Sequence, residues 1–173
     1  MKALMPGSFD PMTLGHLNIL ERCAPMFEKI YVAVMNNDMS KYEEGASSKT
    51  YMFTPNQRLE IVRATVSHIP NAEAVLWEGK LIDFCDEYET VAVIRGVRNT
   101  KDFEYELIHA KYNREHNARA QAIFVPADEK YDGLSSTKIR EVIAKGELSA
   151  LEGSVHPDAL TYIKQLNLKS ERD

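Results

Sequence analysis

A hydroxyl, an imidazole and two glycines lie close together near the amino terminus. Gly7-Ser8 precedes a turn at Asp10-Pro11, and Gly15-His16 follows this turn. A serine and a histidine can hydrogen-bond phosphoryl oxygens, and a glycine lets a ligand approach the backbone closely. The combination predicts a phosphate site at the start of a helix. An ordinary loop with a solvated histidine would show the same few residues, so the remainder of the chain decides between the two interpretations.

The residues on either side of this motif indicate a strand, a turn and a helix. A short apolar run spans residues 2–5, and apolar residues then recur at mostly helical spacing up to Cys23. Thr13 is a favourable N-cap, which places His16 in the first turn of the helix. Backbone N–H groups point outward there, and the helix dipole favours an anion.

Four more apolar runs alternate with helical segments along the chain. The expected strands after the first are 30–35, 72–77, 90–94 and 121–125, and the expected later helices are 55–67, 81–88, 101–117, 136–145 and 157–166. Strands that alternate with helices are typical of a parallel sheet with right-handed crossovers. We therefore predict an α/β fold, a Rossmann-like doubly wound five-stranded parallel sheet with flanking helices.

Length and composition fit one domain. The chain has 173 residues, of which 44% are hydrophobic and 27% charged, which is enough for one core and too little for two ordinary domains. Residues 1–168 are expected to form a single domain and residues 169–173 a flexible tail. The net charge of −5 gives no basic field that would attract nucleic acid.

The two cysteines and the hydropathy indicate a cytoplasmic location. Cys23 and Cys85 lie far apart and form no metal-binding spacing, so we expect reduced, buried thiols. No apolar run of membrane-spanning length and no signal-peptide pattern occurs in the sequence. We therefore expect no membrane association.

Side chains that suit phosphate follow four of the expected strands. In doubly wound sheets, ligands bind beyond the carboxyl ends of the strands, where the strand order reverses. At these ends lie Ser8 and His16, then Lys41 and Lys49 in the long loop 36–53, then Arg95 and Arg98, and finally Ser135, Ser136 and Thr137. Such groups neutralise or hydrogen-bond phosphoryl oxygens. Their joint placement favours a phosphate site over a set of unrelated loop residues.

Four segments of the chain form a combination that is specific to one enzyme family. They are Gly7-Ser8-Phe9-Asp10-Pro11 with Thr13-Leu14-Gly15-His16, Ile94-Arg95-Gly96-Val97-Arg98, Asp102-Phe103-Glu104-Tyr105-Glu106 and Ser135-Ser136-Thr137-Lys138-Ile139-Arg140. They closely resemble the motifs of bacterial phosphopantetheine adenylyltransferase, and the resemblance runs from about residue 2 to residue 165. The Gly-His element is shared with cytidylyltransferases, other nucleotidyltransferases and class I aminoacyl-tRNA synthetases. The segments between Ile94 and Glu106 are much more specific.

The resemblance implies a reaction and a set of site residues. The adenylyl group of ATP would pass to 4′-phosphopantetheine by direct in-line attack at the α-phosphate, which gives dephospho-coenzyme A and pyrophosphate. The implied catalytic residues are His16, Ser8, Lys49 and Arg95, with Lys41 as the alternative to Lys49. The implied contacts of the acceptor are Ser8, Lys49, Leu81 and Arg95. Those of ATP are Ser8, Phe9, His16, Gly96, Val97, Arg98, Glu106, Tyr131, Asp132, Gly133, Leu134, Ser135, Ser136 and Thr137.

The resemblance also implies partners and regulation. Magnesium would accompany ATP without protein ligands of its own, coenzyme A would inhibit by feedback, and the chain would form a homohexamer. Two alternatives stay open, a CTP-dependent cytidylyltransferase of a phosphorylated alcohol and a non-catalytic nucleotide-binding module. The presence of Ser8, His16, Arg95 and Arg98 favours catalysis, since a pure binder does not need an imidazole that stabilises a transition state.

Overall fold

The fold is built on a parallel five-stranded sheet. The computed structural model describes residues 1–35 and 50–170. In this part of the chain the strands are β1 (Lys2–Gly7), β2 (Lys29–Met35), β3 (Ala72–Trp77), β4 (Ala92–Val97) and β5 (Ala122–Pro126). Their order is β3-β2-β1-β4-β5, and every neighbouring pair is parallel. The predicted doubly wound α/β sheet is confirmed.

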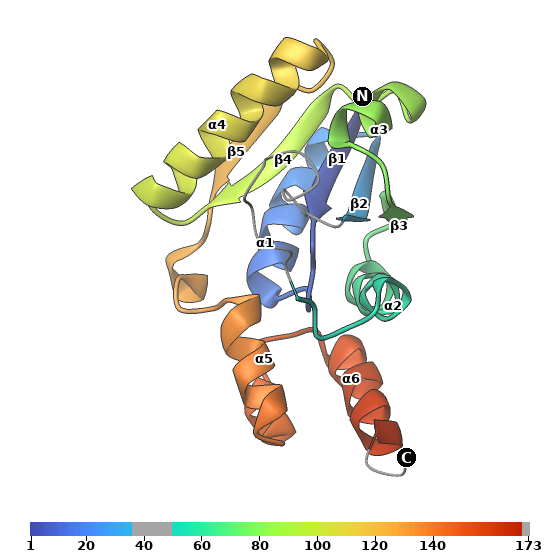
Figure 1. The fold of residues 1–173 in the computed structure, drawn as a ribbon, viewed down its shortest axis with the longest axis vertical. Coiled ribbons are helices and arrows are strands. Elements are labelled where there is room, and N and C mark those ends of the chain that lie inside the picture. Colours follow the sequence, from blue (N-terminus) through green and yellow to red (C-terminus); the bar gives the residue numbers. More distant parts are fainter. Residues whose placement is uncertain (36–49, 171–173) are drawn as a thin grey trace.

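Helices flank this sheet and extend beyond one end of it (Figure 1). The described helices are α1 (Leu14–Cys23), α2 (Pro55–Val66), α3 (Leu81–Glu87), α4 (Thr100–His116), α5 (Ser136–Ala144) and α6 (Pro157–Ser170). Short 3₁₀ turns are η1 (Ala24–Met26), η3 (Glu129–Tyr131) and η4 (Leu148–Leu151). The helices α5 and α6 lie below the sheet in Figure 1. Helix α6 continues to Ser170, beyond residue 166, where the sequence predicted its end.

Strand β1 is buried on both faces. Its Ala3 and Met5 belong to a core cluster that includes Leu20 of α1 and Ile61 of α2. Leu4 points to the opposite face, where it joins a second cluster with Phe84 of α3. Both clusters consist mainly of side chains removed from water, which is the main favourable contribution to folding. The central strand is thus held between two apolar layers, as expected for a parallel sheet.

Strand β4 ends later than the sequence predicted. The apolar run suggested residues 90–94, whereas the strand continues to Val97. The reason is pairing with β5, because Arg95, Gly96 and Val97 lie opposite Phe124, Val125 and Pro126. Arg95 and Gly96 are therefore the last part of the strand itself, not the loop that follows it.

Strands β1 and β4 separate soon after they pair. Their register contains only Ala3 opposite Ala92 and Leu4 opposite Val93, whereas β1 pairs with β2 along its whole length. Pro6 has no N–H to donate to a neighbouring strand. Its carbonyl accepts a hydrogen bond of 3.3 Å from Nη1 of Arg95, a side chain of β4. The sheet consequently opens between β1 and β4, at their carboxyl ends.

A segment shortly before α6 contacts the first residue of α1. The N–H of Leu14, the first residue of α1, donates to the carbonyl of Ser154 at 2.9 Å.

Cys23 and Cys85 are unpaired and buried, as predicted. Within residues 1–35 and 50–170, no helix has both the length and the apolar character needed to cross a membrane.

Candidate active site

A cleft of about 420 Å³ lies where β1 and β4 separate. It is surrounded by the ends of these strands and by the beginnings of α1, α4 and α5. Of the residues assigned from the sequence, the cleft is lined by Ser8, Phe9, His16, Arg95, Gly96, Arg98, Glu106, Tyr131, Leu134, Ser135, Ser136 and Thr137. Segments far apart in the sequence thus meet in one place, at the point where the strand order reverses.

Several assigned residues do not line this cleft. Val97, Asp132 and Gly133 are neighbours of lining residues but are not part of the surface of the cleft. Leu81, at the start of α3, packs against the core cluster that contains Leu4 and Phe84. Both candidate lysines, Lys41 and Lys49, lie outside the described residues.

His16 is held by the capping arrangement of α1. The Thr13 hydroxyl accepts a hydrogen bond from the His16 N–H at 3.3 Å, and the Thr13 N–H donates to His16 Nδ1 at 3.1 Å. This reciprocal pair is a capping box in which histidine takes the place usually held by glutamate or glutamine. Because Nδ1 accepts, the proton of the neutral ring resides on Nε2. The imidazole therefore offers an N–H donor on the side of the ring away from Thr13.

His16 is also kept uncharged. The pKa of His16 is lowered from 6.5 to about 4, mainly by removal of the ring from water and also by the nearby Arg98 and Arg95 charges. The Phe9 ring packs edge-on against the imidazole, with ring centroids 5.5 Å apart. At neutral pH the side chain thus acts as a hydrogen-bond donor that is fixed in orientation, not as a cation or a base.

Two arginines at the cleft are paired with carboxylates of α4. Arg95 donates from Nε and Nη2 to the two oxygens of Glu106, both at 2.6 Å. These side chains are only 18% and 15% exposed, so solvent screens the pair little. Arg98 makes a similar but more exposed pair with Asp102, in which its Nε donates at 2.7 Å. The cationic groups are therefore held in place before any ligand arrives.

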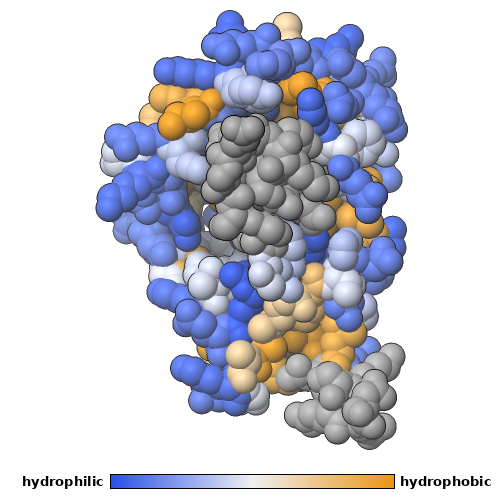
Figure 2. Space-filling view, in the orientation of Figure 1, coloured by the Kyte–Doolittle hydropathy of each residue, from blue (hydrophilic) through white to orange (hydrophobic). Residues whose placement is uncertain are grey.

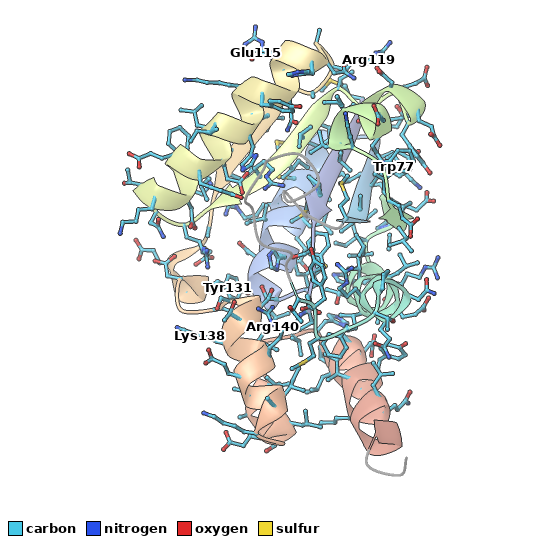
Figure 3. All side chains as sticks on the ribbon, in the orientation of Figure 1. Trp77, Glu115, Arg119, Tyr131, Lys138 and Arg140 are labelled. Carbon is cyan, nitrogen blue, oxygen red and sulfur yellow. The ribbon has the colours of Figure 1, made fainter. Side chains whose placement is uncertain are left out.

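Helix α5 closes the opposite wall. Ser135 caps it by accepting a hydrogen bond from the Lys138 N–H. The Ser136 hydroxyl donates to the Pro11 carbonyl at 2.8 Å, and Arg140 Nη1 donates to the Asp10 carbonyl at 2.7 Å. Figure 3 shows Arg140 and Tyr131 together near the start of this helix, close to α1. The amino-terminal ends of α1 and α5 consequently face the same cleft, where their unpaired N–H groups favour an anion.

The structure adds residues that the sequence did not assign to the site. Asp102, Tyr105 and Arg140 line the cleft, although each lies inside a motif already quoted. The four-residue spacing of Arg98, which precedes α4, and Asp102, in its first turn, would have been a usable signal. Arg140 donates to Thr137 on its own helix, but its contact with the turn is through the distant Asp10, which local spacing does not reveal.

Comparisons with known proteins agree with this geometry. Residues 4–142 match the model of the Cytidylyltransferase-like family. The protein named phosphopantetheine adenylyltransferase of Staphylococcus carnosus (strain TM300) is 38% identical over 141 residues, which are 82% of this chain and 82% of that protein. The chain belongs to the phosphopantetheine adenylyltransferase family. Members of this family are nucleotidyltransferases, and this chain is such an enzyme.

A solved structure shows how far the fold extends. The crystal structure of a putative nicotinate-nucleotide adenylyltransferase from Vibrio parahaemolyticus superposes with a TM-score of 0.65. The superposition covers 96% of this chain and 93% of the Vibrio chain, and the sequence identity is 14%. At this identity the likeness establishes a shared fold, and the adenylyltransferase family assignment depends on the sequence match.

The charge state of His16 can be measured by NMR. In protein labelled with ¹⁵N at histidine, we expect a neutral ring protonated on Nε2 at pH 7 that titrates near pH 4. Because this pKa lies below 6.5, the unfolded chain takes up the proton first as the pH falls. As the pH falls from about 6.5 to about 4, proton uptake by His16 in the unfolded chain therefore lowers the free energy of unfolding. Above pH 6.5 the titration of His16 has no such effect. A midpoint near 6.5 would contradict the capped, half-buried imidazole.

The Arg95–Glu106 pair can be tested through folding stability. Glu106→Gln removes the negative charge and leaves the half-buried guanidinium without a full partner, so we expect the free energy of unfolding to fall by about 2 kcal/mol. Urea titration monitored by circular dichroism measures the change. Glu104→Gln is the matched control, because Glu104 lies on the same helix and is exposed. Equal urea midpoints for the two variants would contradict the role of the pair.

Proposed function

We propose that this enzyme transfers the adenylyl group of ATP to 4′-phosphopantetheine, with dephospho-coenzyme A and pyrophosphate as products. This is the penultimate step of coenzyme A biosynthesis. The main support is the convergence of His16, Ser8, two arginines and two helix amino termini on one cleft. The name of the relative from Staphylococcus carnosus supports the choice of acceptor.

Direct attack by the acceptor phosphate on the α-phosphate needs positioning and charge stabilisation. Negative charge builds up on the α-phosphoryl oxygens as the new bond forms, so fixed donors accelerate the step. His16 would donate from Nε2 and Ser8 from its hydroxyl. Because His16 is neutral, it need not lose or gain a proton during the reaction.

The two substrates would occupy different parts of the cleft. The triphosphate would lie toward the amino terminus of α5, near residues 131–137, with Phe9, Gly96 and Arg98 beside the nucleotide. Arg95, oriented by Glu106, would hold the attacking phosphate together with Lys49 or, as the alternative, Lys41. Leu81 lies outside the cleft, so its contact would be with the far end of the pantetheine arm.

Magnesium would enter as the counter-ion of ATP. Among residues 1–35 and 50–170, no group of three or more His, Cys, Asp or Glu side chains could hold a metal ion. The carboxylates of Glu106 and Asp102 in the cleft are already paired with arginines. Such a site fits an ion held by phosphates and water, which magnesium accepts readily. When bound, it would neutralise part of the charge on the phosphates.

Isotope exchange tests the substrates. We expect labelled pyrophosphate to enter ATP only when dephospho-coenzyme A is present, because the reverse reaction regenerates ATP from these two compounds. Liquid scintillation counting of the isolated nucleotide measures the exchange. Exchange into CTP would favour a cytidylyltransferase, and no exchange with any nucleotide would favour a non-catalytic module.

His16→Ala serves as the control for this assay. Removal of one donor to the transition state is expected to slow exchange by about a hundredfold or more, whereas the affinity for ATP changes little. Calorimetric titration with ATP measures that affinity. A loss confined to ATP binding would contradict the role given to His16.

The surface of α4 supports assembly into a homohexamer. Among the described residues of α4, none is fully buried, and Phe103, Ile108 and Tyr112 expose much of their side chains. Ile108 is 67% exposed, and apolar colour gathers in the region of α4 at the upper left of Figure 2. Exposed large apolar side chains on an unburied helix support a protein interface. Coenzyme A, which shares the pantetheine arm with the product, would act as feedback inhibitor in the same cleft.

A charged substitution tests this interface. Ile108→Glu places an unpaired charge in the proposed contact, so the variant is expected to form smaller particles than the wild-type hexamer. Light scattering coupled to gel filtration measures the mass. Met26→Glu, at a residue 57% exposed in η1, should leave the mass unchanged. A monomeric wild-type protein, or an unchanged mass for Ile108→Glu, would contradict the proposal.

A further inference from the structure

A buried arginine lies behind the strand-to-helix turn of the cleft. Arg58 of α2 is 1% exposed, and its Nη1 donates to the carbonyl of Ser8 at 2.7 Å. Its guanidinium also covers the Tyr51 ring, 4.2 Å from the centroid. A guanidinium is costly to remove from water unless polar and aromatic partners compensate. Arg58 does not line the cleft, so it touches the turn from the side away from the cleft.

The carbonyl that Arg58 binds determines where a neighbouring N–H points. The C=O of Ser8 and the N–H of Phe9 belong to one peptide group, which is planar and trans, so the two bonds point in opposite directions. Arg58 draws the carbonyl toward α2. The Phe9 N–H is thereby turned to the other side, where Ser8 and Phe9 border the cleft. Within residues 1–35 and 50–170, no acceptor for this N–H is found.

The backbone of Phe9 needs such external support. Its φ angle is 45°, in the left-handed region that side chains other than glycine seldom adopt. The ring is 3% exposed and lies directly over Gly7, where a Cβ would come within 2.7 Å of it. On the carboxyl side, Asp10 accepts hydrogen bonds from the N–H groups of Met52 and Phe53, both at 3.0 Å. The turn is thus fixed from several directions, and Arg58 is the contact that sets the Ser8–Phe9 peptide.

We propose that Arg58 is a positioning residue for adenylyl transfer: by holding the Ser8 carbonyl, it aims the Phe9 N–H at a non-bridging oxygen of the α-phosphate. This inference rests on the proposed function, and Arg58 itself does not touch the substrate. Burial lowers the pKa of Arg58, while the Tyr51 and Asp10 side chains act in the opposite direction. A guanidinium stays protonated at neutral pH in any case, so it donates permanently.

The alternative is that Arg58 only fills space between α2 and the turn. A space-filling role would affect the amount of folded enzyme and would affect every substrate equally. A positioning role affects one hydrogen bond to one oxygen. Substitution of that oxygen by sulfur separates the two, because sulfur is a weak acceptor for an N–H donor.

The experiment compares ATP with the two diastereomers of ATPαS, each of which carries sulfur at a different non-bridging α-oxygen. For the wild-type enzyme we expect one diastereomer to react more slowly, the one with sulfur at the oxygen that Phe9 N–H contacts. Arg58→Met is expected to slow the reaction of ATP by about tenfold or more and to bring the rates of the two diastereomers closer together. Arg58→Lys keeps the charge without the planar fork, so its rate and its diastereomer ratio should be intermediate.

Ile61→Ala is the matched control. Ile61 lies on the same helix, is fully buried and does not line the cleft, so its truncation destabilises the fold without changing the turn. Rates normalised to folded protein should keep the wild-type ratio in this variant. A wild-type ratio in Arg58→Met, or a wild-type enzyme without diastereomer preference, would overturn the proposal. If Arg58→Met does not fold, Arg58→Lys carries the test by the same criterion. A wild-type protein that forms no product would instead refute the proposed function.

Discussion

The site depends on how little β1 and β4 pair. These two strands are neighbours in the sheet, yet their ladder stops after Leu4 and Val93. Pro6 cannot continue it, and the Arg95 side chain takes the place of a strand N–H by donating to the Pro6 carbonyl. An apolar core runs beneath this opening, so the strands can diverge at one end without loss of the fold. The cleft thus lies where β1 and β4 no longer pair, and residues at the ends of these strands line it.

The same contacts stabilise the fold and set the chemistry of the site. The capping box of α1 satisfies backbone groups at the start of a helix, and it also fixes the tautomer of His16. The two arginines that would attract phosphate also help to keep that imidazole uncharged. Each arginine is in turn neutralised by a carboxylate of α4, so the cleft holds organised charge without a large net charge. Preorganised dipoles of this kind suit a reaction that creates charge on an oxygen.

Local features could be predicted from the sequence, whereas contacts between distant segments could not. The cap Thr13 follows from its residue type and its place before the first helix. The true end of β4 could not be predicted, since it depends on pairing with β5. The family motifs pointed to Arg95 and Glu106 separately, and only the structure reveals that they bind each other. Arg58 gave no signal, because an arginine on a helix is normally read as a solvated residue.

The hydrogen bond from Leu14 to Ser154 has a consequence for the synthesis of the chain. Translation proceeds from the amino terminus, so the helix that carries His16 leaves the ribosome long before the segment that completes its first turn. The wall of the cleft formed by α5 is likewise synthesised after β1, α1 and β4. The cleft of a nascent chain is therefore complete only after α5 has been synthesised. Helices α5 and α6 also add Ile139, Ile143, Leu160 and Ile163 to the apolar core, so the completion of the cleft and of the core depends on the same stretch of chain.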